Sequence, residues 1–201
     1  MKISAIKPAV KTKGRFNLFV DGKYSFSLGE QQVLDEGIML DQDIDEPRLE
    51  ALKRASDFGK KYARALELIV RRARSVKEIH DYGWRKKWTP EETQQIVEKL
   101  QAKGYLDDEK FALVWIRSRA LLKNISRRKL QLELRQKGIQ AEIIEQVINA
   151  SEDYDERQAL RDLIAKKQGR YADPQKFMAF LLRQGFSYGD VKQVMEEAAS
   201  S

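Results

Sequence analysis

One pattern of residue types occurs twice in the C-terminal half of the chain at identical offsets. Counting from Ser126, leucines follow at +4 and +8, a glycine at +12, and aliphatic residues at +13, +18, +21 and +22; counting from Asp173, every apolar offset is apolar again and the glycine is again a glycine. A weaker copy starts at Ser75, where Lys87 takes the glycine position. Copies spaced by 51 and 47 residues indicate small supersecondary units that bury their cores by stacking on their neighbours.

Helix start and stop signals divide each copy into short helices. Ser75 with Glu78, and Thr89 with Glu92, have the spacing of capping boxes, and Ser126 and Asp173 are expected to be helix caps. Gly104, Gly138 and Gly185 are typical helix ends. We therefore predict a mainly α fold, an elongated tandem array of three three-helix repeats. The expected units span residues 58–108, 109–154 and 155–201. A stripe of Leu66, Ile69, Val70 and Ala73 is expected to face the core of the first unit.

The first 57 residues differ from the rest. Asp21-Gly22 separates two runs of aromatic and β-branched residues, which is a strong signal for a β-hairpin with a type I′ turn. Phe16, Leu18 and Val20 share one face by their spacing, and Tyr24 and Phe26 are expected to line the partner strand. Residues 1–57 are therefore predicted to form a small N-terminal β-hairpin region with a short helix.

The residues that enzymes use are scarce. The chain has no cysteine and a single histidine, His80, which excludes thiol chemistry, disulfides and a multi-histidine metal cage. Residues 41–46 lack the glycine of a calcium loop, and Asp107-Asp108-Glu109 is best explained as the negative first turn of a helix. We expect no catalytic residue, no cofactor and no metal. Nothing suggests a membrane span or a secretory signal, so we expect a cytoplasmic monomer.

The basic charge is concentrated in the middle of the chain. The net charge is +7, but residues 61–140 alone carry 20 basic and 10 acidic side chains. Such a field attracts polyanions, although each cation could also belong to a solvated helix face. Trp84 is expected to be exposed and Trp88 to lie in the core, and the basic residues around them suit stacking and phosphate contact. Arg127-Arg128-Lys129 lies in the first turn of a helix, where cations oppose the helix dipole, so we expect these three side chains to be exposed. The candidate partner-binding residues are Arg71, Arg72, Arg74, Arg85, Lys86, Lys87, Arg117, Arg119, Lys123, Arg127, Arg128, Lys129, Arg135 and Lys137.

Part of the sequence resembles a known family. Gly104-Tyr105-Leu106-Asp107-Asp108, followed by Phe111-Ala112, is similar to a motif of the RecX family, and so is Leu130, Glu133-Leu134, Lys137-Gly138-Ile139. The resemblance extends over residues 60–195 and departs from the family at Lys87-Trp88 and Asn124-Ile125. It implies tandem three-helix repeats and a non-catalytic regulator of the bacterial recombinase RecA. The implied partner is the filament of RecA on single-stranded DNA, with contact to the DNA either direct or through the filament.

The leading hypothesis is therefore a protein that binds the RecA filament and inhibits its recombinase, ATPase and coprotease activities in DNA repair, recombination and the SOS response. The alternative is a stand-alone helical DNA-binding module, because short helices with basic first turns also suit groove binding. A purely structural helical scaffold is the third hypothesis. The first two differ in whether DNA binding requires the recombinase.

Overall fold

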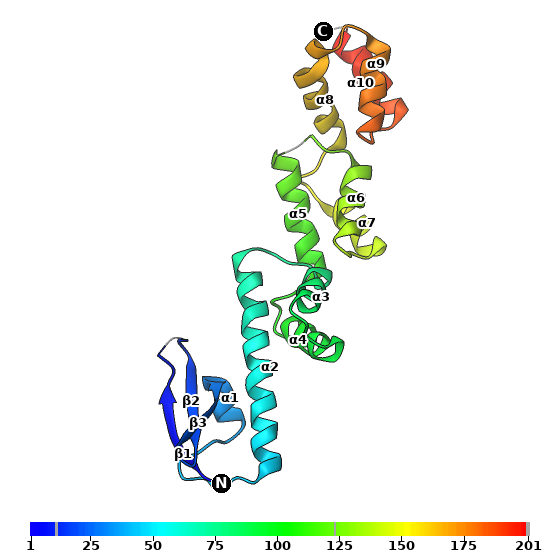
Figure 1. The fold of residues 1–201 in the computed structure, drawn as a ribbon. Helices are drawn as coiled ribbons and strands as arrows, with labels where there is room; N and C mark the ends of the chain where they lie inside the picture. The colour runs from blue at the N-terminus through cyan, green and yellow to red at the C-terminus, as the bar shows by residue number, and fades with distance from the viewer. Residues whose placement is uncertain (11, 123, 200–201) are drawn as a thin grey trace.

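The protein is an elongated row of modules in a computed structural model that describes residues 1–10, 12–122 and 124–199. A small sheet lies at the N-terminal end, and three helical units follow one after another to the C-terminus (Figure 1).

The first module contains β1 (Ile3–Pro8), β2 (Arg15–Val20), β3 (Lys23–Gly29) and α1 (Glu30–Asp35). Unit 1 contains α2 (Glu46–Arg71), α3 (Val76–Arg85) and α4 (Pro90–Ala102). Unit 2 contains α5 (Asp108–Leu122), α6 (Arg127–Gln136) and α7 (Ala141–Ala150). Unit 3 contains α8 (Glu156–Lys167), the 3-10 turn η1 (Gln168–Arg170), α9 (Pro174–Arg183) and α10 (Tyr188–Ala199).

The N-terminal module is a three-stranded antiparallel sheet in the order β1-β2-β3. Asp21 and Gly22 have φ values of 47° and 79°, which is the type I′ turn that the sequence predicts. Phe26 is buried, but the expectation for Tyr24 is wrong. A bulge between Leu18 and Phe19 shifts the register, so that Tyr24 pairs with Phe19 on the other face of the sheet and is 56% exposed.

Helix α2 connects the sheet to the helical units. Its N-terminal half supplies Leu49 and Leu52 to the core of the first module, and the hydroxyl of Ser56 donates a 2.6 Å hydrogen bond to the carbonyl of Ser27 in β3. Its C-terminal half supplies Ala65 to the core of unit 1. One continuous helix thus belongs to two cores, which fixes the sheet against unit 1. The predicted stripe is only partly correct. Leu66 and Ile69 pack against the unit 1 core, but Ala73 packs against the core of unit 2 and Val70 is 78% exposed.

Each helical unit has its own core, which confirms the predicted tandem array. The repeated apolar positions of units 2 and 3 are buried or partly buried in separate clusters. The buried residues of unit 1 are Ala65, Ile79, Trp88, Ile96, Val97, Leu100 and Leu106. Those of unit 2 are Phe111, Ala112, Ile116, Ile125, Leu130, Leu134, Ile139, Ile144, Val147 and Ile148. Those of unit 3 are Leu160, Leu163, Ile164, Phe177, Leu181, Phe186, Val191 and Val194.

Unit 1 departs from the repeated pattern at two core positions, where one side chain is smaller and the other larger than in the other units. Gly83 stands where the other units have a leucine, and Trp88 stands where they have isoleucine or phenylalanine. A Cβ on Gly83 would lie 2.5 Å from Thr93 Oγ1 and 3.2 Å from Trp88 Cε3. Thr93 and the indole together therefore occupy the space that a leucine side chain would fill. Trp88 is a core residue as predicted, with 7% of its surface exposed.

Candidate partner-binding surface

Units 1 and 2 meet at a polar joint built from helix ends. Ser75 is the N-cap of α3, and its hydroxyl accepts a 3.2 Å hydrogen bond from the amide of Glu78. The same hydroxyl donates a 2.7 Å hydrogen bond to the carbonyl of Lys137, the C-cap residue of α6 in unit 2. The amide of Val76 donates to a carboxylate oxygen of Asp108, at the start of α5, over 2.8 Å. Backbone groups that a helix end leaves without a partner are thus satisfied across the joint.

Units 2 and 3 meet through the same arrangement. The hydroxyl of Ser126 caps α6 and donates a 2.8 Å hydrogen bond to the carbonyl of Gln184, the C-cap residue of α9. The amide of Arg127 donates to Glu156 at the start of α8 over 2.8 Å. In unit 3 the corresponding cap is Asp173, which lacks the hydroxyl group that Ser75 and Ser126 use as a donor. The joint is therefore part of the repeat, and the last copy of the cap lacks its donor.

The joints also explain where the repeat requires glycine. Gly138 and Gly185 have φ values of 83° and 97°, and each is pressed against the preceding unit. A Cβ on Gly138 would lie 2.5 Å from Lys77 Cβ, and one on Gly185 would lie 2.6 Å from Ser126 Oγ. Lys87 holds the same position in unit 1 with φ 58°, where no three-helix unit precedes it. A side chain is tolerated there because only backbone strain opposes it.

Glu78 binds one cation of its own unit, Arg72, and one across the first joint, Lys137. The predicted capping box at Ser75 is only half formed. Instead of accepting from the Ser75 amide, the Glu78 carboxylate forms ion pairs of 2.9 Å with Arg72 and of 2.9 Å with Lys137. Burial alone would raise the pKa of the Glu78 carboxyl, but hydrogen bonds and charge from Arg72 and Lys137 outweigh it and lower the pKa to about 2. Glu78 therefore stays ionised and holds unit 1 to unit 2.

Several of the predicted partner-binding cations are used inside the fold. Arg119 lies over the ring of Trp115, 4.3 Å from its centroid, and pairs with Glu133, whose carboxylate also accepts a hydrogen bond from the Trp115 indole. Lys137 lies 4.9 Å from the same centroid on the joint side. These side chains contribute packing and cation–π contacts. The cations with an ion pair are Arg71 with Glu67, Arg72 with Glu78, Arg117 with Asp153, Arg119 with Glu133, Arg127 with Glu145 and Lys137 with Glu78.

The expectation that Arg127, Arg128 and Lys129 are all exposed is wrong for Arg127. Its guanidinium is half-buried and reaches both Glu145 and Asn149 over 2.7 Å, so its placement in the first turn of α6 is compensated within the fold. Arg128 and Lys129 are exposed, and Lys129 Nζ donates to the side chain of Gln184 across the second joint. Arg128 and Lys129 thus form no salt bridge with another described residue, and of the two only Lys129 has a side-chain hydrogen bond, to Gln184.

A smaller set of cations remains available to a partner. Among the residues that the structure describes, these side chains form no salt bridge: Arg74, Arg85, Lys86, Lys87, Arg128, Lys129 and Arg135. Lys123 lies outside the described residues. These seven predicted cations lie on α3 and the turns beside it, or on α6, so the predicted cations that remain free belong to units 1 and 2.

Two adjoining hollows follow α3 and contain both free cations and aromatic rings. One, of about 510 Å³, is lined by Trp84, which is 80% exposed, together with Arg72 and Asp81. The other, of about 390 Å³, is lined by Tyr82 and Lys86. The two hollows share Arg74, Glu78 and Arg85. Trp84 is thus exposed as the sequence predicts, and it lies beside two guanidinium groups.

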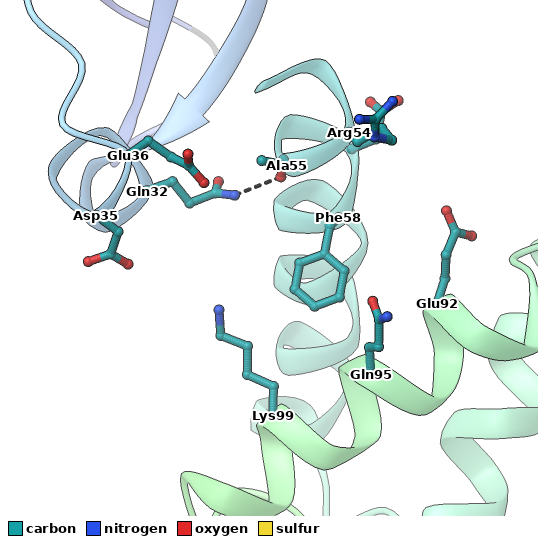
Figure 2. Close-up of a pocket in the computed structure, with 10 residues that line it drawn as sticks. Gln32, Asp35, Glu36, Arg54, Ala55, Phe58, Glu92, Gln95 and Lys99 are labelled. Atoms are coloured by element: carbon teal, nitrogen blue, oxygen red, sulfur yellow. Dashed lines mark hydrogen bonds between the residues drawn. The ribbon is translucent and has the colours of Figure 1, made fainter. Parts of the chain in front are cut away.

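A third hollow, of about 450 Å³, lies where α1, α2 and α4 meet (Figure 2). Figure 2 shows Gln32 reaching from α1 to the carbonyl of Ala55, and Phe58 and Lys99 on neighbouring helices, with Lys99 Nζ 5.5 Å from the ring centroid. Two of its carboxylates already have a cation as partner, because Glu92 is paired with Lys61 and Glu36 with Arg48. This hollow is the junction between the sheet module and unit 1.

The described part of the chain contains no group of three or more histidine, cysteine or acidic residues placed to hold a metal ion. None of its helices is both long and apolar enough to span a bilayer.

Comparison with known proteins assigns the family. Three family models match in order: the regulatory protein RecX N-terminal domain over residues 1–45, the first three-helix domain of RecX over 62–100 and the second over 107–148. Regulatory protein RecX of Listeria welshimeri is 30% identical over 208 aligned positions, which cover 100% of this chain and 77% of the relative. The chain belongs to the RecX family. The RecX protein of Listeria innocua is 31% identical with the same coverage, and that of Clostridium botulinum strain Alaska E43 is 26% identical over 98% of this chain and 96% of its own length.

Solved structures of RecX proteins agree with this fold. A crystal structure of regulatory protein RecX superposes with a TM-score of 0.82 at 27% identity and covers 97% of this chain and 98% of its own. The RecX structure from Lactobacillus salivarius superposes with a TM-score of 0.66 over 73% of this chain and shares the fold. The resemblance seen in the motif at residues 104–112 thus extends to the whole chain. The chain thus belongs to a family of regulatory proteins.

Sequence reasoning did not find the joints. Ser75, Ser126 and the two glycines were identified only as helix ends, and Asp108 only as a first-turn carboxylate. The sequence does contain a signal for the joints, because a serine cap is paired with a glycine twelve residues later. The first unit has Lys87 in place of the glycine, and the last unit has Asp173 in place of the serine.

Proposed function

We propose that this protein binds the filament of RecA on single-stranded DNA as a monomer in the cytoplasm and inhibits its recombinase, ATPase and coprotease activities. Its role is then in DNA repair, recombination and the SOS response. The observation that carries the proposal is the match to RecX proteins along the whole chain, in sequence and in fold.

The shape and charge of the molecule support binding to a large anionic assembly. A row of small units, each with its own core, presents an extended surface to a partner. The free cations of units 1 and 2 lie on that surface, and Arg128 and Arg135 on α6 are exposed without a salt bridge among the described residues. Exposed cations speed encounter with a negatively charged partner.

The test mixes the purified protein with preformed RecA filaments and follows ATP hydrolysis and filament length in parallel. We expect ATP hydrolysis to fall and filaments to shorten at protein amounts at or below the amount of RecA. The matched control is Lys166→Ala with Arg170→Ala, which removes two exposed charges from unit 3 and should inhibit as the wild type does. Unchanged hydrolysis and unchanged filament length with the wild-type protein would contradict the proposal.

A further inference from the structure

We propose that the double hollow along α3, between Trp84 and Tyr82, is a binding site for single-stranded nucleic acid, with a base stacked on Trp84 and the adjoining phosphates on Arg74 and Arg85. Its biological role rests on the proposed function, because the filament contains single-stranded DNA. The binding itself is a property of this chain alone and is tested without RecA.

The first argument comes from the repeat, which separates residues that the fold requires from residues that it does not. Arg74 occupies the position directly before the helix cap, where unit 2 has Ile125, a core residue that is 4% exposed. At the position of Trp84, unit 2 has Arg135 and unit 3 has Leu182. The three-helix unit therefore folds without this combination, and a structural role does not account for it.

The second argument is the electrostatic cost of the cluster. Arg85 is in the last turn of α3, where the helix dipole favours a cation. Arg74 lies next to the N-terminus of the same helix, where the dipole opposes one. Burial lowers the pKa of the Arg74 guanidinium, and the positive charges of Arg72 and Arg85 lower it further, against the attraction of Glu78. A bound phosphate would relieve this repulsion.

The third argument concerns the carboxylates that share the hollows. Glu78 is paired with Arg72 and Lys137, and Asp81 is paired with Lys77 over 2.7 Å. Within the part of the chain that the structure describes, the side-chain hydrogen bonds of Arg74 and Arg85 go to backbone carbonyls, those of Leu68 and Asp81, at 3.4 and 3.3 Å. Their remaining N–H groups can therefore donate to a phosphate without breaking an ion pair.

The fourth argument concerns the aromatic rings. Trp84 is 80% exposed. Exposure of an indole ring to water costs free energy, which a ligand that covers the ring would recover. Tyr82 is partly buried with Lys86 Nζ 5.7 Å from its ring centroid. An exposed ring beside guanidinium groups is the arrangement that binds single strands without reading their sequence. A duplex keeps its bases stacked and offers none to Trp84, so the site favours single strands.

The experiment measures binding of a fluorescein-labelled single-stranded oligothymidylate to the full chain by fluorescence anisotropy, with RecA absent, so that the signal does not depend on the protein's own tryptophans. Trp88 and Trp115 are less exposed than Trp84, so quenching of tryptophan fluorescence in the wild type should come mainly from Trp84. We expect Trp84→Ala to raise the Kd about 5- to 100-fold, the effect of losing one stacked base. Arg74→Gln and Arg85→Gln should each reduce the slope of log Kd against log salt by about 0.7, the value for one single-strand phosphate contact.

The controls separate stacking from general charge. Tyr188→Ala removes an exposed ring, and Arg170→Gln an exposed guanidinium, from unit 3, and both should bind as the wild type does. An abasic strand of equal length should bind wild type and Trp84→Ala equally. Equal binding of wild type and Trp84→Ala to the oligothymidylate would overturn the site. Competition by polyglutamate as strong as that by the oligothymidylate would also overturn it, because the hollows would then bind an acidic polypeptide. These outcomes are independent of RecA inhibition. If the wild type inhibits RecA but does not bind the oligonucleotide, the proposed site is wrong and the proposed function is unaffected.

Discussion

The hydroxyl of Ser75 lies 2.7 Å from the carbonyl oxygen of Lys137, a residue 62 positions later in the chain and in the next unit. The same hydroxyl accepts the amide of Glu78 at the start of α3. A single hydroxyl oxygen of a buried residue thus caps the start of one helix of unit 1 and binds the end of one helix of unit 2. Ser126 and Gln184 repeat this relationship at 2.8 Å, so the path of the array depends on a joint used twice.

Replacing Ser75 by alanine should cost more than the loss of an ordinary helix cap. Removing a cap costs about 1 kcal/mol, and leaving the Lys137 carbonyl without a partner adds about 1–3 kcal/mol. Urea unfolding should therefore show a loss of about 2–4 kcal/mol in the free energy of unfolding. The matched control is Ser187→Ala, because Ser187 caps the start of α10 on an exposed surface. A loss equal to that of Ser187→Ala would contradict the role of the joint.

Replacing Gly138 by alanine should displace unit 2 from unit 1. The new Cβ would meet Lys77 Cβ at 2.5 Å in addition to the strain of a φ of 83°. Gly104→Ala is the matched control, since Gly104 has φ 70° and no atom within 4 Å of the added Cβ. We expect Gly104→Ala to lose about 1–2 kcal/mol of unfolding free energy from backbone strain and Gly138→Ala to lose about 1–3 kcal/mol more from overpacking. Small-angle scattering should show changed dimensions for Gly138→Ala alone; identical curves for both variants would argue against a rigid joint.

The stability of the first joint should depend on pH through Glu78. Its pKa falls from the ordinary 4.5 to about 2 in the folded protein, so its contribution is fully present above about pH 5 and is lost as the pH falls toward 2. The shift corresponds to at most about 3 kcal/mol. Unfolding of Glu78→Gln should therefore be easier than that of the wild type at pH 7, and the difference should shrink by pH 3.

The control for this pH dependence is Glu142→Gln, which removes an exposed carboxylate of α7 and should leave the wild-type profile unchanged. Hydrogen exchange at low pH should show loss of protection first where α3 meets α6. A Glu78→Gln variant with the same pH profile as the wild type would show that this carboxylate does not hold the joint.

Arg128→Ala combined with Arg135→Ala should weaken inhibition of RecA without unfolding the protein. Both guanidinium groups are exposed and form no salt bridge with any described residue, so the unfolding free energy should change by less than about 0.5 kcal/mol for each. The concentration needed for half inhibition of ATP hydrolysis should rise, and its dependence on salt should become shallower. Arg127→Ala is the informative contrast, because it breaks the contacts with Glu145 and Asn149 and should destabilise unit 2. Full inhibition by the double variant would exclude α6 as a contact surface.

Sequence reasoning predicted the features that short-range interactions decide. The hairpin turn at Asp21-Gly22, the caps at Ser75, Thr89 and Ser126 and the helix ends at Gly104, Gly138 and Gly185 all occur as predicted. Each depends on a backbone preference or on a hydrogen bond between residues a few positions apart. Two predictions failed because of other contacts. A bulge places Tyr24 on the other face of the sheet. The capping box at Ser75 is incomplete because the carboxylate of Glu78 pairs with Arg72 and Lys137.

For the candidate surface, the sequence alone supplied the cations and the aromatic residues, and it marked Trp84 as exposed. It could not decide which cations are free, because every cation looks alike until its neighbours are known. Arg119 and Arg127 are paired with Glu133 and Glu145, 14 and 18 residues away, and Lys137 with Glu78 at a separation of 59.

The sequence by itself determined the number of helical units, their order and the repeated apolar positions of their cores, because helical periodicity and caps act within about one turn of a helix. Only the tertiary structure decided how the units join and which charges remain for a partner. Coulombic attraction and hydrogen bonding depend on distance in space, and the packed array brings together residues that the sequence places up to 62 positions apart.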